Sequence, residues 1–335
     1  MHYFRNSIIF TIVCLVIWFF VGYYQGGIWT WFSSLFIVAV LGILETSISF
    51  DNAIVNTTVL KNMNDLWRHR FLTWWILIAV IGMRIIFPLL IVSLFGSVSP
   101  REALRLAILD AEQYATILDY AHIPILWFGG AFLMMVWLRY FFNPNKDTHR
   151  IWLLEHYMQK MHKMESVEIA IVLIIMLVFG SYMDMKTMLN FMISGVIGII
   201  VYIFVDWFAS ILQSKELHVI DVAKSSAMSF LYLEVLDASF SLDGVIGAFA
   251  LSKNLLVIAL WLGIGAYFVR SMTIYLYEKW TLNTYKYLEN GAFWAICILA
   301  MMMFLGTIVY VPEVLTWLIG IVVIALSILS SLKYK

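Results

Sequence analysis

The chain has 335 residues, of which 63% are hydrophobic and 13% are charged, and its mean hydropathy is +0.91. A soluble globular domain is about half apolar and about a quarter charged. The composition therefore excludes an ordinary soluble domain and predicts an all-α polytopic membrane protein embedded in the lipid bilayer. The 21 basic residues equal the 21 acidic residues, so we expect no nucleic-acid partner.

Ten segments have the roughly 20 mostly apolar residues that a transmembrane helix needs. In chain order they are 7–26, 30–52, 71–96, 123–142, 166–184, 188–208, 226–250, 254–276, 288–310 and 313–332. The first of them lacks the small-residue cleavage site of a signal peptide, so we expect it to be retained as a span. Two further segments, 99–121 and 210–224, have amphipathic patterns typical of helices that lie along the membrane interface.

The distribution of basic residues orients these ten spans. Fifteen Lys and Arg fall on the side of the N-terminus and four on the other side, while Arg84 and Arg270 fall inside spans. Because basic residues concentrate in cytoplasmic loops, both termini are predicted to be cytoplasmic. We expect a multi-pass protein of the bacterial inner membrane.

One polar motif occurs twice in the apolar sequence. The string LETSISFDNAIV at 44–55 aligns with LDASFSLDGVIG at 236–247, in the second and seventh spans. Five spans separate the copies, so the two copies cross the membrane in opposite directions. Further pairs follow in the same order, Arg84 with Arg270 and His122 with Glu289.

The ordered pairs predict two inverted repeats of five helices, an organisation typical of secondary transporters. The first half would comprise residues 1–165 and the second residues 166–335, with repeat cores at 30–142 and 226–310. The alternative is a chance resemblance between apolar segments.

Five acids and two arginines are predicted at membrane depth. Each charge would cost about 2.5–3.5 kcal/mol if it faced lipid at a helix centre, so these side chains must face the bundle interior or a wet cavity. Two arginines cannot neutralise five acids. A bound divalent cation would remove most of the excess, and protonation of some carboxyls is the other explanation. The acids are Glu45, Asp51, Glu234, Asp237 and Asp243.

Helix geometry suggests where the second and seventh spans are interrupted. Glu45 and Asp51 would lie about 120° apart on an unbroken helix, so one face cannot present both. Asn52 and Gly244 follow the second acid of each copy, and both residue types adopt left-handed backbone readily. We therefore expect breaks at about Asp51-Asn52 and Asp243-Gly244, where buried backbone lines the site.

The donors of the two copies are all oxygen atoms, which suits Mn²⁺ and leaves Ca²⁺ or Mg²⁺ open. We expect Arg84 and Arg270 to act as counter-charges, or as fixed partners of one acid each. His122 and Glu289 are candidates for gates or proton relays. The predicted metal ligands are Glu45, Ser49, Asp51, Asn52, Glu234, Asp237, Ser241 and Asp243.

Two further features are separate from the motif. The loop 143–165 contains three His and three Met, and it is either a cytosolic metal sensor or an amphipathic interfacial helix. Gly195, Gly198, Gly263 and Gly265 are predicted helix-packing contacts.

The motif resembles that of the TerC family of integral membrane proteins, within the lysine-exporter superfamily. Proteins of that family carry a Glu-x-x-Leu-Ser-x-Asp-Asn motif, which ETSISFDN matches with Ile48 at the Leu position. The second copy, DASFSLDG, has Gly244 where Ser is usual, and the chain is most similar to a longer branch. The resemblance implies manganese efflux or metal supply to secreted enzymes. It implies Glu45, Asp51, Asn52, Asp237 and Asp243 as metal ligands.

The sequence thus predicts an exporter of a divalent cation, Mn²⁺ first, that works by alternating access with proton antiport as a further option. Two other classes stay open. One is a membrane partner of the secretion machinery that supplies metal to exported proteins, and the other is an intramembrane hydrolase. The motif contains no nucleophile, so we expect that the protein is not an enzyme. A homodimer is a further open prediction.

Overall fold

The structure is a computed structural model of the chain. It describes residues 2–20, 50–61, 63–144, 146, 152–161, 166–213, 255–279, 285–309 and 311–333, with isolated residues at 35, 38, 42, 45–46, 229–230, 232–234 and 237. Within these residues the secondary structure is helical and contains no strand, in agreement with the predicted all-α class.

The chain divides into two compact units. The first comprises Met1–Ala53, Arg68–His122 and Phe240–Lys279, and the second comprises Ile54–Trp67, Ile123–Ser239 and Trp280–Lys335. Each unit takes segments from both predicted halves of the chain. The halves 1–165 and 166–335 therefore remain a prediction about the repeat and do not describe these units.

In the first unit, the N-terminal helix Arg5–Phe20 packs along α11 (Leu255–Glu278). The hydroxyl of Ser7 lies 2.6 Å from the Ser271 hydroxyl and donates to the Tyr267 carbonyl at 3.0 Å. The ring of Phe10 stacks on Tyr267 with a centroid distance of 4.4 Å. The buried hydroxyl groups bond to polar groups on the opposite helix, so the two apolar helices can associate closely. A short 3₁₀ turn, η1 (His2–Phe4), precedes the first helix.

The predicted span 71–96 is helical but changes its type along its length. It begins in α3 (Asp65–Leu77), continues as a π-helix, η2 (Ile78–Ile86), and ends as α4 (Phe87–Phe95). Pro88 has no N–H to donate to the Arg84 carbonyl, so α-helical bonding cannot run through this point. The π-helix gives way to α4 at this proline. π-Helical turns occur frequently at functional sites, and Arg84 lies in this one.

The amphipathic segment predicted at 99–121 is not one helix. It is divided at Asp110 into α5 (Pro100–Leu109) and the start of α6 (Ala111–Phe141). Ser99 caps α5 by accepting from the Glu102 N–H at 3.3 Å, and the Asp110 carboxylate accepts from the Gln113 N–H at 3.1 Å. The span expected at 123–142 is therefore the second part of a longer helix.

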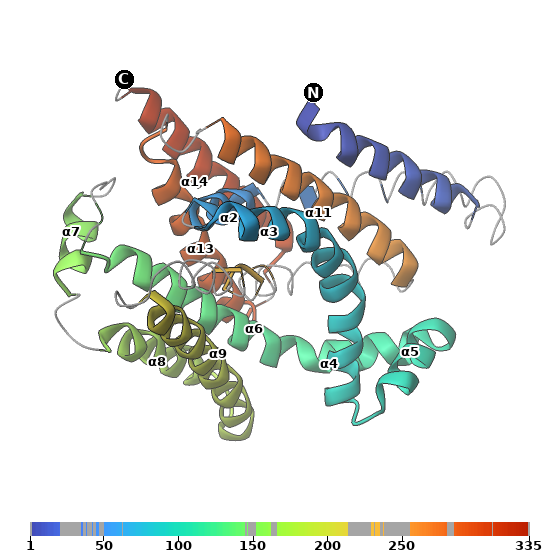
Figure 1. The fold of residues 1–335 in the computed structure, drawn as a ribbon. Helices are drawn as coiled ribbons and strands as arrows, with labels where there is room; N and C mark the ends of the chain where they lie inside the picture. The colour runs from blue at the N-terminus through green and yellow to red at the C-terminus, as the bar shows by residue number, and fades with distance from the viewer. Residues whose placement is uncertain are drawn as a thin grey trace. The chain divides into compact units, whose positions relative to one another are not determined.

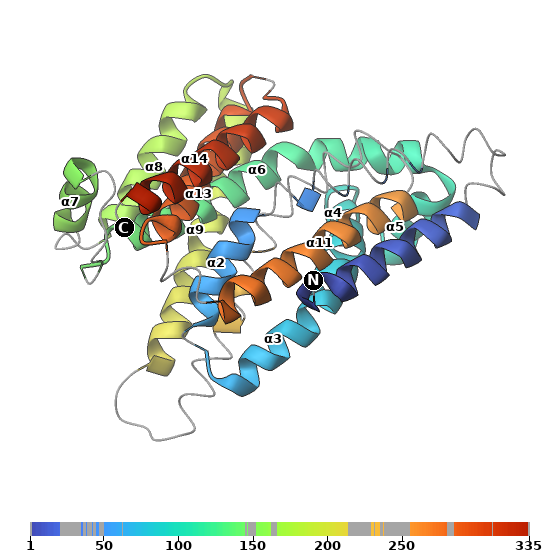
Figure 2. The ribbon, with the colours of Figure 1, turned by 90° about the horizontal axis from the view of Figure 1, so that it is seen from above.

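The second unit contains most of α2 (Phe50–Leu60), α7 (Trp152–Met161), α8 (Val167–Gly180), α9 (Met185–Gln213), α13 (Leu288–Leu305) and α14 (Glu313–Lys333). The pairs α13–α14 and α8–α9 lie side by side in both ribbon views (Figures 1 and 2). Gly198 brings its helix α9 against the carbonyl of Phe128 in α6, as predicted for a helix-packing glycine.

The part of α6 in this unit packs antiparallel to α13. Tyr140 stacks on Phe293 with a centroid distance of 3.6 Å, while ten residues earlier Gly130 lies against Ala300 and Phe304. The contacts run in opposite directions along the two helices. These are the helices of the predicted fourth and ninth spans, which the repeat requires to be antiparallel.

Among the described residues, four helices are long and apolar enough to cross a membrane, and a fifth span is added if Val80–Phe95 and α5 form one bent span. Along α9 a row of large apolar side chains is exposed, as expected for a lipid-facing surface: Leu189, Ile193, Ile197, Ile200 and Phe204. By length and composition these are the helices of a multi-pass membrane protein. The count of ten spans stays a prediction, because the segments 30–52 and 226–250 lie largely outside the described residues.

Candidate functional site

The first acid of the first motif copy is buried beside a glycine. Glu45 has helical backbone and is 8% exposed, in the same unit as α11. A Cβ at position 265 would lie 2.9 Å from the Glu45 Cβ and closer still to its Cγ. Gly265 thus makes room for the carboxylate-bearing side chain. The predicted packing role of Gly265 is confirmed, and its neighbour is one of the predicted site residues.

The break expected at Asp51-Asn52 is wrong. Both residues have helical backbone within α2, and Asn52 does not adopt the left-handed backbone. Ser49 lies outside the described residues, and Asn52 is 8% exposed.

At the start of the second motif copy, two acids lie about one helical turn apart, Asp237 within the copy and Glu234 just before it. Glu234 and Asp237 both have helical backbone, and Asp237 is only 3% exposed. Both carboxylate oxygens of Glu234 are buried, and neither has a hydrogen-bond partner among the residues that the structure describes. The expected break at Asp243-Gly244 and the ligand Ser241 lie outside those residues.

The buried amide of Asn56 on α2 was not predicted from the sequence. Asn56 is 1% exposed, and neither its Oδ1 nor its Nδ2 has a hydrogen-bond partner within the described chain. It lies four residues after Asn52, so the two amides occupy the same side of the helix, about 6 Å apart along its axis. The spacing Asn-x-x-x-Asn in an apolar span is a signal that could have identified it.

The predicted counter-charges and gates lie on described helices. Arg84 lies in the π-helix η2, which packs against α11, the helix that contains Arg270. His122 lies in α6 two residues before Pro124, and Glu289 lies in the first turn of α13. Both His122 and Glu289 are half-buried. Their roles as counter-charges, gates or proton relays stay predictions.

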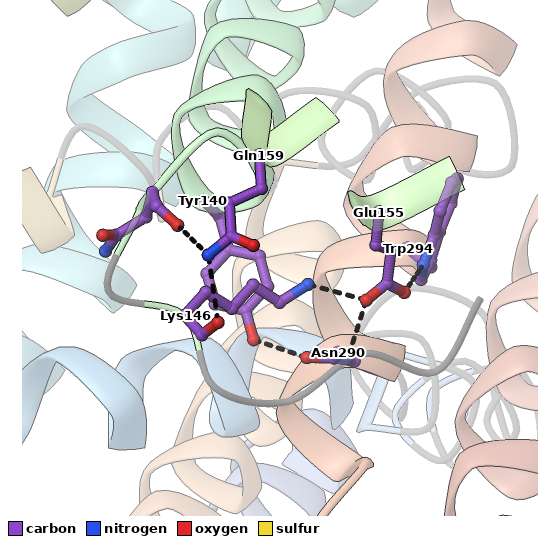
Figure 3. Close-up of polar contacts among 7 residues, drawn as sticks. Tyr140, Lys146, Glu155, Gln159, Asn290 and Trp294 are labelled. Atoms are coloured by element: carbon purple, nitrogen blue, oxygen red, sulfur yellow. Dashed lines mark hydrogen bonds and ion pairs between the residues drawn. The ribbon is translucent and has the colours of Figure 1, made fainter. Parts of the chain in front are cut away.

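A second buried polar cluster lies at the start of α13 and is fully hydrogen-bonded (Figure 3). Glu155 of α7 is completely buried, and its Oε2 accepts from the Lys146 ammonium at 2.9 Å. The same oxygen accepts from the Asn290 amide at 3.2 Å, and Oε1 accepts from the Trp294 indole at 3.2 Å. Tyr140 donates to the Asn290 Oδ1 at 2.7 Å. We call these five residues the α13 cluster.

The α13 cluster anchors the helix that was expected within 143–165. Burial lowers the pKa of the Lys146 ammonium, while the bond to Glu155 acts in the opposite direction. The ammonium also lies 3.7 Å from the centroid of the Phe141 ring. Gln159 donates to the Lys146 carbonyl at 3.2 Å (Figure 3) and to the Pro144 carbonyl at 2.8 Å. Both alternatives for this segment, an interfacial helix and a metal sensor, stay predictions.

The α13 cluster and the unpartnered buried groups offer different chemistry. In the α13 cluster each carboxylate and amide group has a partner. Glu234 offers two unpartnered carboxylate oxygens and Asn56 separately offers one amide oxygen, which are the donors that Mg²⁺, Ca²⁺ and Mn²⁺ prefer. No group of three or more His, Cys, Asp or Glu converges within the part of the chain that the structure describes, which leaves out Asp243.

One comparison with known proteins found a match. The model of a family described as "Protein of unknown function (DUF475)" matches residues 50–335. Neither the search of curated proteins nor that of solved structures found a match.

Proposed function

The chain belongs to the DUF475 family, and we propose that it exports a divalent cation, Mn²⁺ first, across the bacterial inner membrane. The ligands in this proposal come from both motif copies and from one acid outside them. They are Glu45, Ser49, Asp51 and Asn52 from the first copy, Asp237, Ser241 and Asp243 from the second, and Glu234, which precedes the second copy.

One observation carries the proposal. Glu234 has two buried carboxylate oxygens without a described partner, one turn from the buried Asp237. Two carboxylates this close repel each other at depth unless a cation or protons neutralise them. A bound cation would remove this repulsion and would also give the Glu234 oxygens a partner.

The likeness to TerC proteins and the inverted repeat give the proposal its mechanism. Two inverted halves would rock around the acidic site, exposing it first to the cytoplasm and then outside. The antiparallel contact between α6 and α13 supports opposite orientations for one predicted pair of spans. Carboxylates that release Mn²⁺ would take up protons, which makes proton antiport the coupled reaction.

Purified protein reconstituted into liposomes tests this proposal. We expect uptake of Mn²⁺ that exceeds that of protein-free liposomes and that Asp237→Asn abolishes. Ca²⁺ and Mg²⁺ in parallel assays define the selectivity, and an imposed proton gradient should accelerate Mn²⁺ movement. Failure to move any of the three ions, by protein that is monodisperse and folded, would contradict the proposal.

A further inference from the structure

Helix α2 is buried along most of its described length. Ala53, Ile54 and Val55 are 0% exposed, and Thr57 and Leu60 are equally buried. A helix buried all round is normally apolar all round. Asn56 departs from this rule at a position that is 1% exposed.

The Asn56 amide has no described partner for either of its polar atoms. An amide buried in this way destabilises the folded protein, because both polar groups lose their bonds to water without replacement. The neighbouring hydroxyl of Thr58 avoids that cost because it donates to the Ile54 carbonyl at 3.1 Å. An unsatisfied buried group of this kind indicates an ion, a ligand or a buried water that completes it.

We propose that Asn56 is a second station for the cation, one helical turn beyond Asn52. The Oδ1 atom of Asn56 coordinates a partly hydrated divalent cation, and its Nδ2 donates to a water of that hydration shell. A partly hydrated ion completes both polar atoms, because it offers a positive charge and water oxygens together. This inference rests on the proposed function, and it extends the ligand set along α2 beyond the repeated motif.

The competing explanation is a buried structural water, which would also complete the amide. The two explanations differ in what Asn56→Leu does to Mn²⁺ affinity. Leucine is branched at Cγ like asparagine, is larger and has no polar atom, so it removes the ligand without leaving a cavity. A structural water would be lost with the amide and would leave Mn²⁺ affinity unchanged.

The experiment measures equilibrium binding of Mn²⁺ to the purified full-length protein, as the free ion remaining in solution. We expect Asn56→Leu to weaken binding about tenfold, the effect of losing one neutral ligand. Asn56→Asp adds a charged oxygen at the same place and should tighten binding. Thr58→Val is the matched control on the same helix and should bind Mn²⁺ within about twofold of wild type.

Each outcome decides one of the two claims. If wild type binds Mn²⁺ and Asn56→Leu binds it with unchanged affinity, this inference is overturned and the proposed function stands. If wild type binds none of Mn²⁺, Ca²⁺ and Mg²⁺, both fall together. If Asn56→Leu does not fold, Asn56→Asp is the test instead. Mn²⁺ binding by Asn56→Asp that is equal to or weaker than that of wild type overturns the inference.

Discussion

The second unit contains two glutamates and two asparagines with buried polar atoms, and these atoms are satisfied differently in Glu155 and Asn290 than in Glu234 and Asn56. Glu155 and Asn290 are fully buried, and each of their carboxylate and amide groups has a partner in the α13 cluster. The polar atoms of Glu234 and Asn56 are buried without partners in the described chain. Burial alone therefore does not separate a structural polar group from a binding group.

The two sets of residues differ in the source of the positive charge that neutralises the carboxylate. In the α13 cluster the chain supplies a cation itself, the Lys146 ammonium, at the cost of burying it. At Glu234 and Asn56 we infer that the cation comes from solution. A buried polar network whose groups bond to one another makes the protein more rigid. Buried polar groups that need an ion as a partner destabilise the folded protein until the ion binds.

The largest expected effect is on the α13 cluster. Lys146→Met leaves the Glu155 carboxylate buried with two neutral donors and no charge, which should reduce the free energy of unfolding by about 3–5 kcal/mol. The melting temperature of purified protein measures this change. Adding Glu155→Gln to Lys146→Met removes the stranded charge and should recover part of the loss. If Lys146→Met melts at the same temperature as wild type, the Lys146 ammonium does not stabilise the buried Glu155 carboxylate.

A smaller effect separates the two buried amides. Asn290→Leu strands the Tyr140 hydroxyl and removes a donor to Glu155, so it should reduce the free energy of unfolding by about 2 kcal/mol. Asn56→Leu should leave the melting temperature without added metal unchanged or raise it, because it removes an unsatisfied group. The two variants are compared in the same melting series. Equal destabilisation by both would show that Asn56 is scaffolding.

A smaller structural effect is expected at Gly265. Gly265→Ala places a methyl group against the Glu45 side chain, which must move, at a cost of about 1–2 kcal/mol. Mn²⁺ binding should weaken in proportion because Glu45 is displaced. Gly263→Ala is the control, since its Cβ would meet Val80 at 3.4 Å, an ordinary contact. If the two alanine variants bind Mn²⁺ equally, Glu45 does not contribute to the site.

Much of the fold was predictable because hydropathy is a local property. The apolar run at 166–184 contains α8, and the runs at 254–276 and 313–332 match the bounds of α11 and α14 to within two residues. The π-helix and the division at Asp110 were not predicted, since they depend on Pro88 and on side-chain caps that hydropathy does not register.

The candidate site residues were predictable from the repeated motif and from an acid in an apolar run. The repeat identified Glu45 and Asp237, and both are buried, while Glu234 was identified as an acid at membrane depth outside the repeat. Asn56 follows the end of the first copy, so comparison of the copies could not identify it. The α13 cluster joins Glu155 to Asn290, which is 135 positions later, and no sequence pattern connects them.

The most direct test of the central claim compares two conservative substitutions, Glu234→Gln and Glu155→Gln, in one melting experiment with and without Mn²⁺. Without metal, Glu155→Gln should lower the melting temperature because it removes the partner of Lys146, while Glu234→Gln should raise it or leave it unchanged. With Mn²⁺, wild type and Glu155→Gln should be stabilised and Glu234→Gln should not be. The account is contradicted if Glu234→Gln melts well below wild type without metal and Mn²⁺ stabilises it as much as wild type.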